Sequence, residues 1–198
     1  RPVDLNAGPD GAIYIADWYD SRLTHVDPHD NWHKTSGRIY RLRNKNAKIS
    51  IPKFDLSQYT NERLVGLLAH KNKWFRQQAL QLFADRKDKS IIPKLMELLD
   101  SENSQTALEA FWALNLSGGF DDPVALHAFN HRDPFVRMWA VRLSGDKNRV
   151  SSVVSDQLAQ LASRESHPEV RSQLASTSKR LTAGAAIPII RKKKKNHD

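Results

Sequence analysis

The stretch that decides the fold is "HRDPFVR", residues 131–137. An aspartate directly before a proline is typical of a helix start, because Asp133 can cap the first free N–H groups and Pro134 has no N–H to satisfy. Related phrases stand at residues 70–76, "HKNKWFR", and at residues 166–171, "SHPEVR". The second helices of the repeat align on Arg76, Ala107, Arg137 and Arg171, at intervals of 31, 30 and 34 residues. The chain therefore contains a regular internal repeat.

Helical periodicity surrounds these phrases and extends over residues 55–181. The segment "NERLVGLLAH", residues 61–70, places its leucine and valine side chains on one broad face. We expect helix pairs near 90–99 and 104–116, 122–130 and 134–144, and 151–163 and 168–181. Paired helices at a nearly fixed interval predict an α-solenoid, and the phrase at 133–137 resembles HEAT repeats. The second of the four repeats departs from the pattern, because Ala107 stands where the other three have arginine.

Large side chains recur in the second helices of these units. Three of the five tryptophans fall there, namely Trp74, Trp112 and Trp139. We interpret them as packing between stacked repeats rather than as an aromatic ligand groove, because large apolar side chains at helical spacing mostly bury themselves. The repeat arginines are interpreted as scaffold residues. In HEAT-like units such an arginine commonly bridges neighbouring repeats.

The chain opens with a different pattern, "GPDGAIYIADWYDSRL", residues 8–23. Short alternating segments at 3–5, 12–16, 22–26 and 37–42 predict four strands. Four strands within this length match one propeller blade, and the pattern resembles the blades of NHL-like and glucose/sorbosone dehydrogenase-like β-propellers. One blade cannot bury both faces of its sheet and needs a neighbour. The alternative is a small β-meander packed on the helical part. The predicted fold class is mostly α, a HEAT-like α-solenoid preceded by a short β segment.

Composition narrows the chemistry of this 198-residue chain. It contains no cysteine, which excludes disulfides, thiolate metal sites and thioether haem attachment within these residues. No stretch reaches the apolar length that a bilayer span requires. The formal net charge is +9, and the last eight residues, "RKKKKNHD", hold five of the cations. We interpret residues 183–198 as a solvated basic loop or tail. Nucleic acid is not an expected partner, because no basic stripe follows a helical face.

Acidic and imidazole side chains gather in residues 16–38, "ADWYDSRLTHVDPHDNWHKTSGR". Together they have the chemistry of a metal site or of general acid–base catalysis. Their spacing matches no zinc-protease, EF-hand, phosphate-loop or nucleophile-elbow motif. In a four-stranded meander, the loops that carry them also lie at opposite ends of the blade. An exposed loop is the favoured interpretation, and no metal site is assigned.

The phrases "ADWY" (16–19), "GRIYR" (37–41) and "LVGLLAHKNKWFRQQA" (64–79) resemble the propeller–HEAT region of membrane-bound dehydrogenases and PVC-type haem-binding (Cys-x-x-Cys-His) domain proteins. These are large exported bacterial proteins. The resemblance implies an extracytoplasmic location, periplasmic or membrane-associated, and oxidation of a sugar or alcohol. Electrons would pass to haem c in a downstream cytochrome domain, with a quinone cofactor or a metal as further options. The residues that match the propeller site are Asp17, Trp18, Tyr19, His25 and Arg38.

The sequence therefore predicts a fragment of a haem-linked, dehydrogenase-like protein. Its expected parts are a terminal blade (1–42), a linker (43–54), helical repeats (55–182) and a basic loop or tail (183–198). Expected partners are the remaining blades and a cytochrome c domain of the same chain, and a protein on the solenoid. Because most blades and the haem motif are missing, no catalysis and no cofactor are expected within this segment. The alternative is a stand-alone HEAT-repeat scaffold for a protein or an anionic partner.

Overall fold

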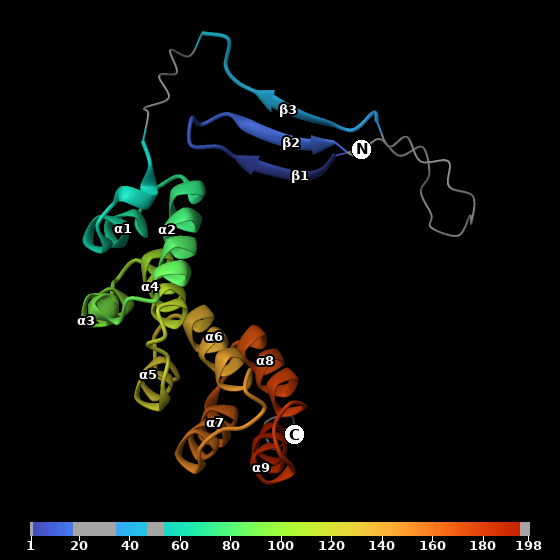
Figure 1. Ribbon diagram of the computed structural model, residues 1–198. Helices are drawn as coiled ribbons and strands as arrows, with labels where there is room; N and C mark the ends of the chain where they lie inside the picture. The colour runs from blue at the N-terminus through green and yellow to red at the C-terminus, as the bar shows by residue number, and fades with distance from the viewer. Residues whose placement is uncertain (1, 18–34, 47–53, 195–198) are drawn as a thin grey trace. The chain divides into compact units, whose positions relative to one another are not determined.

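A computed structural model describes residues 2–17, 35–46 and 54–194, without the side chains of 192–194. The chain divides into two compact units, Arg1–Leu82 and Phe83–Asp198. The predicted fold class is confirmed, because the described residues are mostly helical and the helices follow a short antiparallel sheet (Figure 1). The finer domain boundaries given above remain a prediction.

The sheet lies in the first unit and has three described strands in the order β1-β2-β3: β1 (Pro2–Ala7), β2 (Ile13–Asp17) and β3 (Arg38–Leu42). Both strand pairs are antiparallel. A tight turn joins β1 to β2, and Gly11 occupies its left-handed position at φ 73°, which glycine adopts at little cost. The turn is tied to β3, because Arg41 Nε donates to Asp10 Oδ2 at 2.9 Å. The strand expected at 22–26 lies outside the described residues.

The described helices follow the predicted pairs closely. The first unit contains the 3₁₀ turn η1 (Leu56–Gln58), α1 (Asn61–Leu67) and most of α2 (Lys73–Arg86). The second unit continues with η2 (Lys89–Ile91), α3 (Ile92–Leu99), α4 (Ser104–Leu116), α5 (Asp122–Ala128), α6 (Pro134–Ser144), α7 (Ser152–Arg164), α8 (Pro168–Ser178) and α9 (Ala183–Lys194). From α3 onward, the first and second helices of each pair pack against each other.

The second unit is a two-layer stack of these pairs. The first helices α5, α7 and α9 pack side by side in one layer, and the second helices α4, α6 and α8 do so in the other (Figure 1). The apolar side chains between the layers are buried, among them Phe111, Leu114, Phe129, Leu158 and Leu174. Burying one such side chain contributes about 1.5–3 kcal/mol, so the stack derives its stability from contacts between neighbouring repeats.

Tryptophan packing agrees with the sequence interpretation. Trp112 on α4 and Trp139 on α6 meet edge to face with ring centroids 5.3 Å apart, and both are half-buried. Edge-to-face geometry is favoured because the positive edge of one ring meets the negative face of the other. The pair joins two successive second helices, as expected for packing between stacked repeats.

Helix starts follow the predicted caps with one correction. Asp133 is the N-cap of α6 and accepts from the Phe135 N–H at 2.8 Å, with Pro134 in the first turn. The same aspartate–proline pattern at Asp122 and Pro123 predicts that Asp122 caps α5, but Asp121 accepts from the Val124 N–H at 3.0 Å and is the cap. Proline is tolerated at the second helical position as well as the first, since neither N–H has a partner within the helix. The prediction was therefore wrong by one residue.

The C-terminal segment differs from the predicted basic loop or tail, because most of it is the helix α9. Ala186 and Ile189 are buried, and α9 packs against α7 and α8. Pro188 lies inside the helix, where it removes one backbone hydrogen bond at a cost that this burial offsets. The prediction gave more weight to the run of cations than to the apolar residues before it.

Candidate functional site: a groove between repeat turns

Two of the five residues matched to a propeller site lie among the described residues. Asp17 and Arg38 are register partners at the ends of β2 and β3, so their side chains leave the same face of the sheet. Arg38 is exposed, and its Nη1 donates to the Gly37 carbonyl at 3.0 Å. Trp18, Tyr19 and His25 lie outside the described residues, as does most of the segment rich in aspartate and histidine. The propeller site thus stays a prediction.

The same face of the sheet is apolar and open. Leu5, Ile15 and Tyr40 are in register across the three strands, and Ile13 faces Leu42 beside them. Leu5 is 62% exposed and Leu42 is 54% exposed. An apolar sheet face normally packs against another layer at about 10 Å. This face is therefore a surface suited to a further β or α layer.

The turns before the second helices share one local design. In each, the side chain two residues before the N-cap accepts a hydrogen bond from the N-cap N–H. The four acceptors are His70, Ser101, His131 and Glu165, with distances of 3.0, 3.3, 3.0 and 2.9 Å. Sequence reasoning missed this pattern, although His70 and His131 occupy the same place in their phrases.

The repeat arginines hold these turns closed. Arg76 Nη1 donates to the His70 carbonyl at 2.8 Å, and Arg137 Nη1 donates to the His131 carbonyl at 2.8 Å. Arg171 Nη1 reaches the carbonyl of Glu165 at 3.3 Å. In each case the donor lies six residues after the acceptor. These bonds agree with the interpretation of the arginines as scaffold residues.

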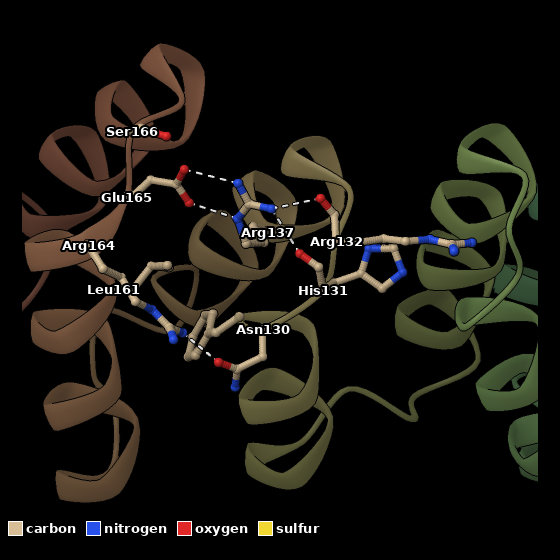
Figure 2. A pocket seen from close by; sticks show the side chains of 9 residues that line it. Asn130, His131, Arg132, Arg137, Leu161, Arg164, Glu165 and Ser166 are labelled. Carbon is tan, nitrogen blue, oxygen red and sulfur yellow. Dashed lines mark hydrogen bonds and ion pairs between the residues drawn. The ribbon is translucent and has the colours of Figure 1, made fainter.

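Arg137 also bridges two repeats. Its Nε donates to Glu165 Oε2 at 2.7 Å and its Nη2 to Glu165 Oε1 at 3.0 Å. Figure 2 shows the guanidinium of Arg137 between this carboxylate and the carbonyls of His131 and Arg132. Such a two-bond pair of guanidinium and carboxylate is strong and directional.

Glu165 is only 5% exposed, and its ionisation reflects opposing effects. Burial by itself raises the pKa of Glu165, but the hydrogen bonds from Arg137 and the His167 N–H outweigh burial and hold the pKa below its ordinary value. The carboxylate is therefore ionised at neutral pH. It serves both as acceptor for its own turn and as the charge partner of the preceding repeat.

A groove of about 330 Å³ lies beside this ion pair, between the α5–α6 turn and the end of α7. Its lining includes Phe129, Asn130, His131, Leu161, Arg164 and Ser166. Arg164 reaches from α7 toward Asn130 and donates from Nη2 to its Oδ1 (Figure 2). The groove is thus walled by residues from two successive repeats.

A second hollow, of about 320 Å³, adjoins the first because Asn130, His131 and Arg132 line both. On this side Arg132 donates from Nη2 to the Ser101 carbonyl, and His127 Nε2 lies 2.7 Å from Asp100 Oδ1. His131 accepts at Nδ1 from the Asp133 N–H, so its Nε2 carries the hydrogen and donates to the Leu99 carbonyl at 2.9 Å. The buried imidazole is a structural bridge to the preceding repeat.

The side chains of these two hollows include groups that can form hydrogen bonds and ion pairs with a ligand. They offer guanidinium, amide and hydroxyl groups, which recognise anions and polar backbone. Among the described residues, no three side chains of His, Cys, Asp or Glu converge as a metal-ligand set. We therefore describe the pair of hollows as the turn groove, defined by Asn130, Arg132, Arg164 and Ser166.

Comparison with known families gives two matches. A family profile for HEAT repeats matches residues 61–142, which cover α1 to α5 and most of α6. A separate profile, for a domain of unknown function called DUF7133, matches residues 1–46, which include the sheet. No curated protein and no solved structure matches the chain. Residues 61–142 are thus similar to HEAT repeats, and α7 and α8 form a further helix pair of the same stack beyond the match.

In the described part of the chain, none of the helices combines the length and the apolar character that crossing a membrane would need.

Proposed function

We propose that the helical repeats act as a docking scaffold within a larger redox protein, in which they join a β-propeller to a cytochrome c domain. The observation that carries the scaffold role is the ladder of bonds between repeats, above all the buried Arg137–Glu165 pair. Fixed turns at regular spacing present a preformed surface, which lowers the entropic cost of binding a partner.

The redox part of the proposal rests on the resemblance of the whole sequence to propeller–HEAT dehydrogenases. The open apolar face of the sheet supports only the presence of a further packed layer, as a propeller would supply. A neighbouring blade would cover that face. The chain has no cysteine, so thioether-linked haem c does not fit these residues and belongs to another domain. A propeller site with Asp17 and Arg38, and an extracytoplasmic location, follow from the same proposal.

The protein encoded by the complete gene provides the test. We expect further blade sequences before residue 1 and a Cys-x-x-Cys-His motif after residue 198. The purified product should give the absorption spectrum of reduced haem c on addition of dithionite. A complete protein without bound haem would overturn the redox part of the proposal and leave the scaffold role in place.

The scaffold role has its own test, in which a photo-reactive side chain replaces Ser166 of the turn groove. The same group at Lys179 on the exposed end of α8 is the control. Docking would be supported if position 166 cross-links one identified protein. That protein, once purified, should then bind the purified chain in a one-to-one complex. Equal labelling at both positions would contradict it.

A second function is favoured by one observation, the two arginines of the turn groove. A stand-alone scaffold for an anionic partner would need such cations, whereas a rigid spacer would not. Titration of a nucleic acid into the chain at rising salt separates the classes, because phosphate contacts lose affinity steeply with salt. Weak binding that does not change with salt would remove nucleic acid as the partner.

A further inference from the structure

The arginines of the second unit differ in what they bond to. Arg137 is paired with Glu165, and Arg180 donates to Asp146 Oδ1 at 2.8 Å. Arg132 and Arg164 instead donate to neutral oxygens, the Ser101 carbonyl and the Asn130 amide. These bonds orient the two guanidinium groups without neutralising them. Within residues 2–17, 35–46 and 54–194, neither side chain has an acidic partner, so both keep their positive charge at the turn groove.

Hydrogen bonds to a neighbouring repeat hold the guanidinium groups of Arg132 and Arg164 in one orientation. Each guanidinium carries five N–H donors in a planar fork, so one bond to a neutral oxygen leaves donors for a carboxylate. Both residues are exposed, and both are held across a repeat boundary. A side chain already fixed in one conformation loses less entropy when it binds a partner.

We propose that the turn groove binds an acidic segment of a partner protein, with Arg132 and Arg164 each contacting one carboxylate. This inference rests on the proposed scaffold function and names the chemistry of its partner. The two hollows adjoin along residues 130–132, so an extended peptide that crosses this turn can place one acidic side chain in each. Asn130 and Ser166 supply polar groups for the backbone between them.

The lining also discriminates against denser anions. Glu165 lies in the first hollow and Asp100 in the second. Arg137 pairs with Glu165, whereas the neighbour of Asp100 is the His127 imidazole. The Asp100 carboxylate repels a phosphate chain or a nucleic acid, which carries a charge at every unit, more strongly than it repels one separate carboxylate. The arrangement thus favours an acidic peptide over a polyphosphate.

The test uses a fluorescein-labelled peptide of alternating glutamate and serine, and its counterpart with glutamine in place of glutamate. The cations of the chain end would attract any acidic peptide, so the background variant carries Lys192→Gln, Lys193→Gln, Lys194→Gln and Lys195→Gln. Fluorescence anisotropy at low salt should give saturable binding of the glutamate peptide only. Arg164→Gln and Arg132→Gln should each weaken it about tenfold, the effect of losing one charge-assisted pair.

Arg149→Gln is the matched control, because Arg149 is an exposed arginine outside the turn groove. It should leave the affinity within about twofold. Amide chemical shifts of Asn130 and Ser166 should move on titration, and circular dichroism confirms that each variant is folded. Equal weakening by the control, or equal binding of the glutamine peptide, would overturn the inference. So would full competition by low concentrations of inorganic phosphate.

Failure here is distinguishable from failure of the scaffold role. If the acidic peptide does not bind but position 166 still cross-links one protein, the inference of an acidic ligand is wrong and the docking role stands. Absence of both overturns docking at this groove, and with it the inference.

Discussion

The N-terminal sheet and the second helical unit use similar apolar residues but bury them very differently. Leu5 of β1 is 62% exposed, whereas Leu158 of α7 is 0% exposed. Both sit in regular elements with well-formed backbone hydrogen bonds. Local pattern therefore determines the element, while burial depends on whether a neighbour of the same kind is present. In the stack each repeat supplies that neighbour for the next.

The largest change in the free energy of unfolding is expected where a buried leucine of the helical stack is truncated, and it tests the contrast with the exposed sheet directly. Leu158→Ala removes buried side-chain volume from α7 and should lower the free energy of unfolding by about 2–5 kcal/mol, because the cavity cannot close fully. Leu5→Ala is the matched change on the open face, with an expected effect below about 0.5 kcal/mol. Urea denaturation of both variants measures the difference. Similar losses would mean that the sheet face is covered in solution.

The next effect concerns the bond between repeats. Glu165→Gln removes the charge partner of Arg137 and should lower the free energy of unfolding at neutral pH by about 1–3 kcal/mol. The lowered pKa of Glu165 gives the direction of the pH dependence. Its contribution is fully present above the unfolded-state pKa of about 4.3 and is lost as the pH falls through the lower folded-state pKa.

Denaturation of the wild type and Glu165→Gln at pH 7 and at pH 3 measures this contribution. The gap between the two proteins should narrow in acid, since the wild-type carboxylate becomes protonated. A gap of constant size would show that the ion pair does not stabilise the stack through its charge.

A smaller effect sharpens the cap assignment. Asp121→Ala should cost about 1 kcal/mol, because the α5 N-cap loses the acceptor for the Val124 N–H. Asp122→Ala, one residue on, removes only a favourable charge in the first turn and should cost about half as much. Thermal unfolding monitored by circular dichroism compares the two. The reverse order would restore the cap predicted from the sequence.

The smallest effect is expected at an exposed ion pair. Lys94 and Glu97 on α3 are 2.7 Å apart, and both side chains are more than half exposed. Glu97→Gln should change the free energy of unfolding by less than about 0.5 kcal/mol, because solvent screens the pair. If Glu97→Gln lowers the free energy of unfolding as much as Glu165→Gln does, burial does not decide how strongly an ion pair stabilises this protein.

Sequence reasoning succeeded where the signal is local or periodic. The cap at Asp133 and the alternating segment at 12–16 depend on residues a few positions apart, and the repeat intervals follow from phrases that recur along the chain. The turn groove was not predicted, because Arg164 and Asn130 meet only when two repeats stack. The role of Glu165 was also hidden, since it replaces the histidine found at positions 70 and 131. Helix α9 was missed because burial of Ile189 depends on α7 and α8.

The placement of the Arg137–Glu165 pair couples the unfolding of two repeats. If α7 and α8 detach, Arg137 keeps its bonds to the carbonyls of its own turn but loses its carboxylate partner. If α5 and α6 detach, Glu165 keeps the hydrogen bond from the His167 N–H but loses its counter-charge. Either event breaks the same charge-assisted pair, so under mechanical load the two repeats should yield together rather than one after the other.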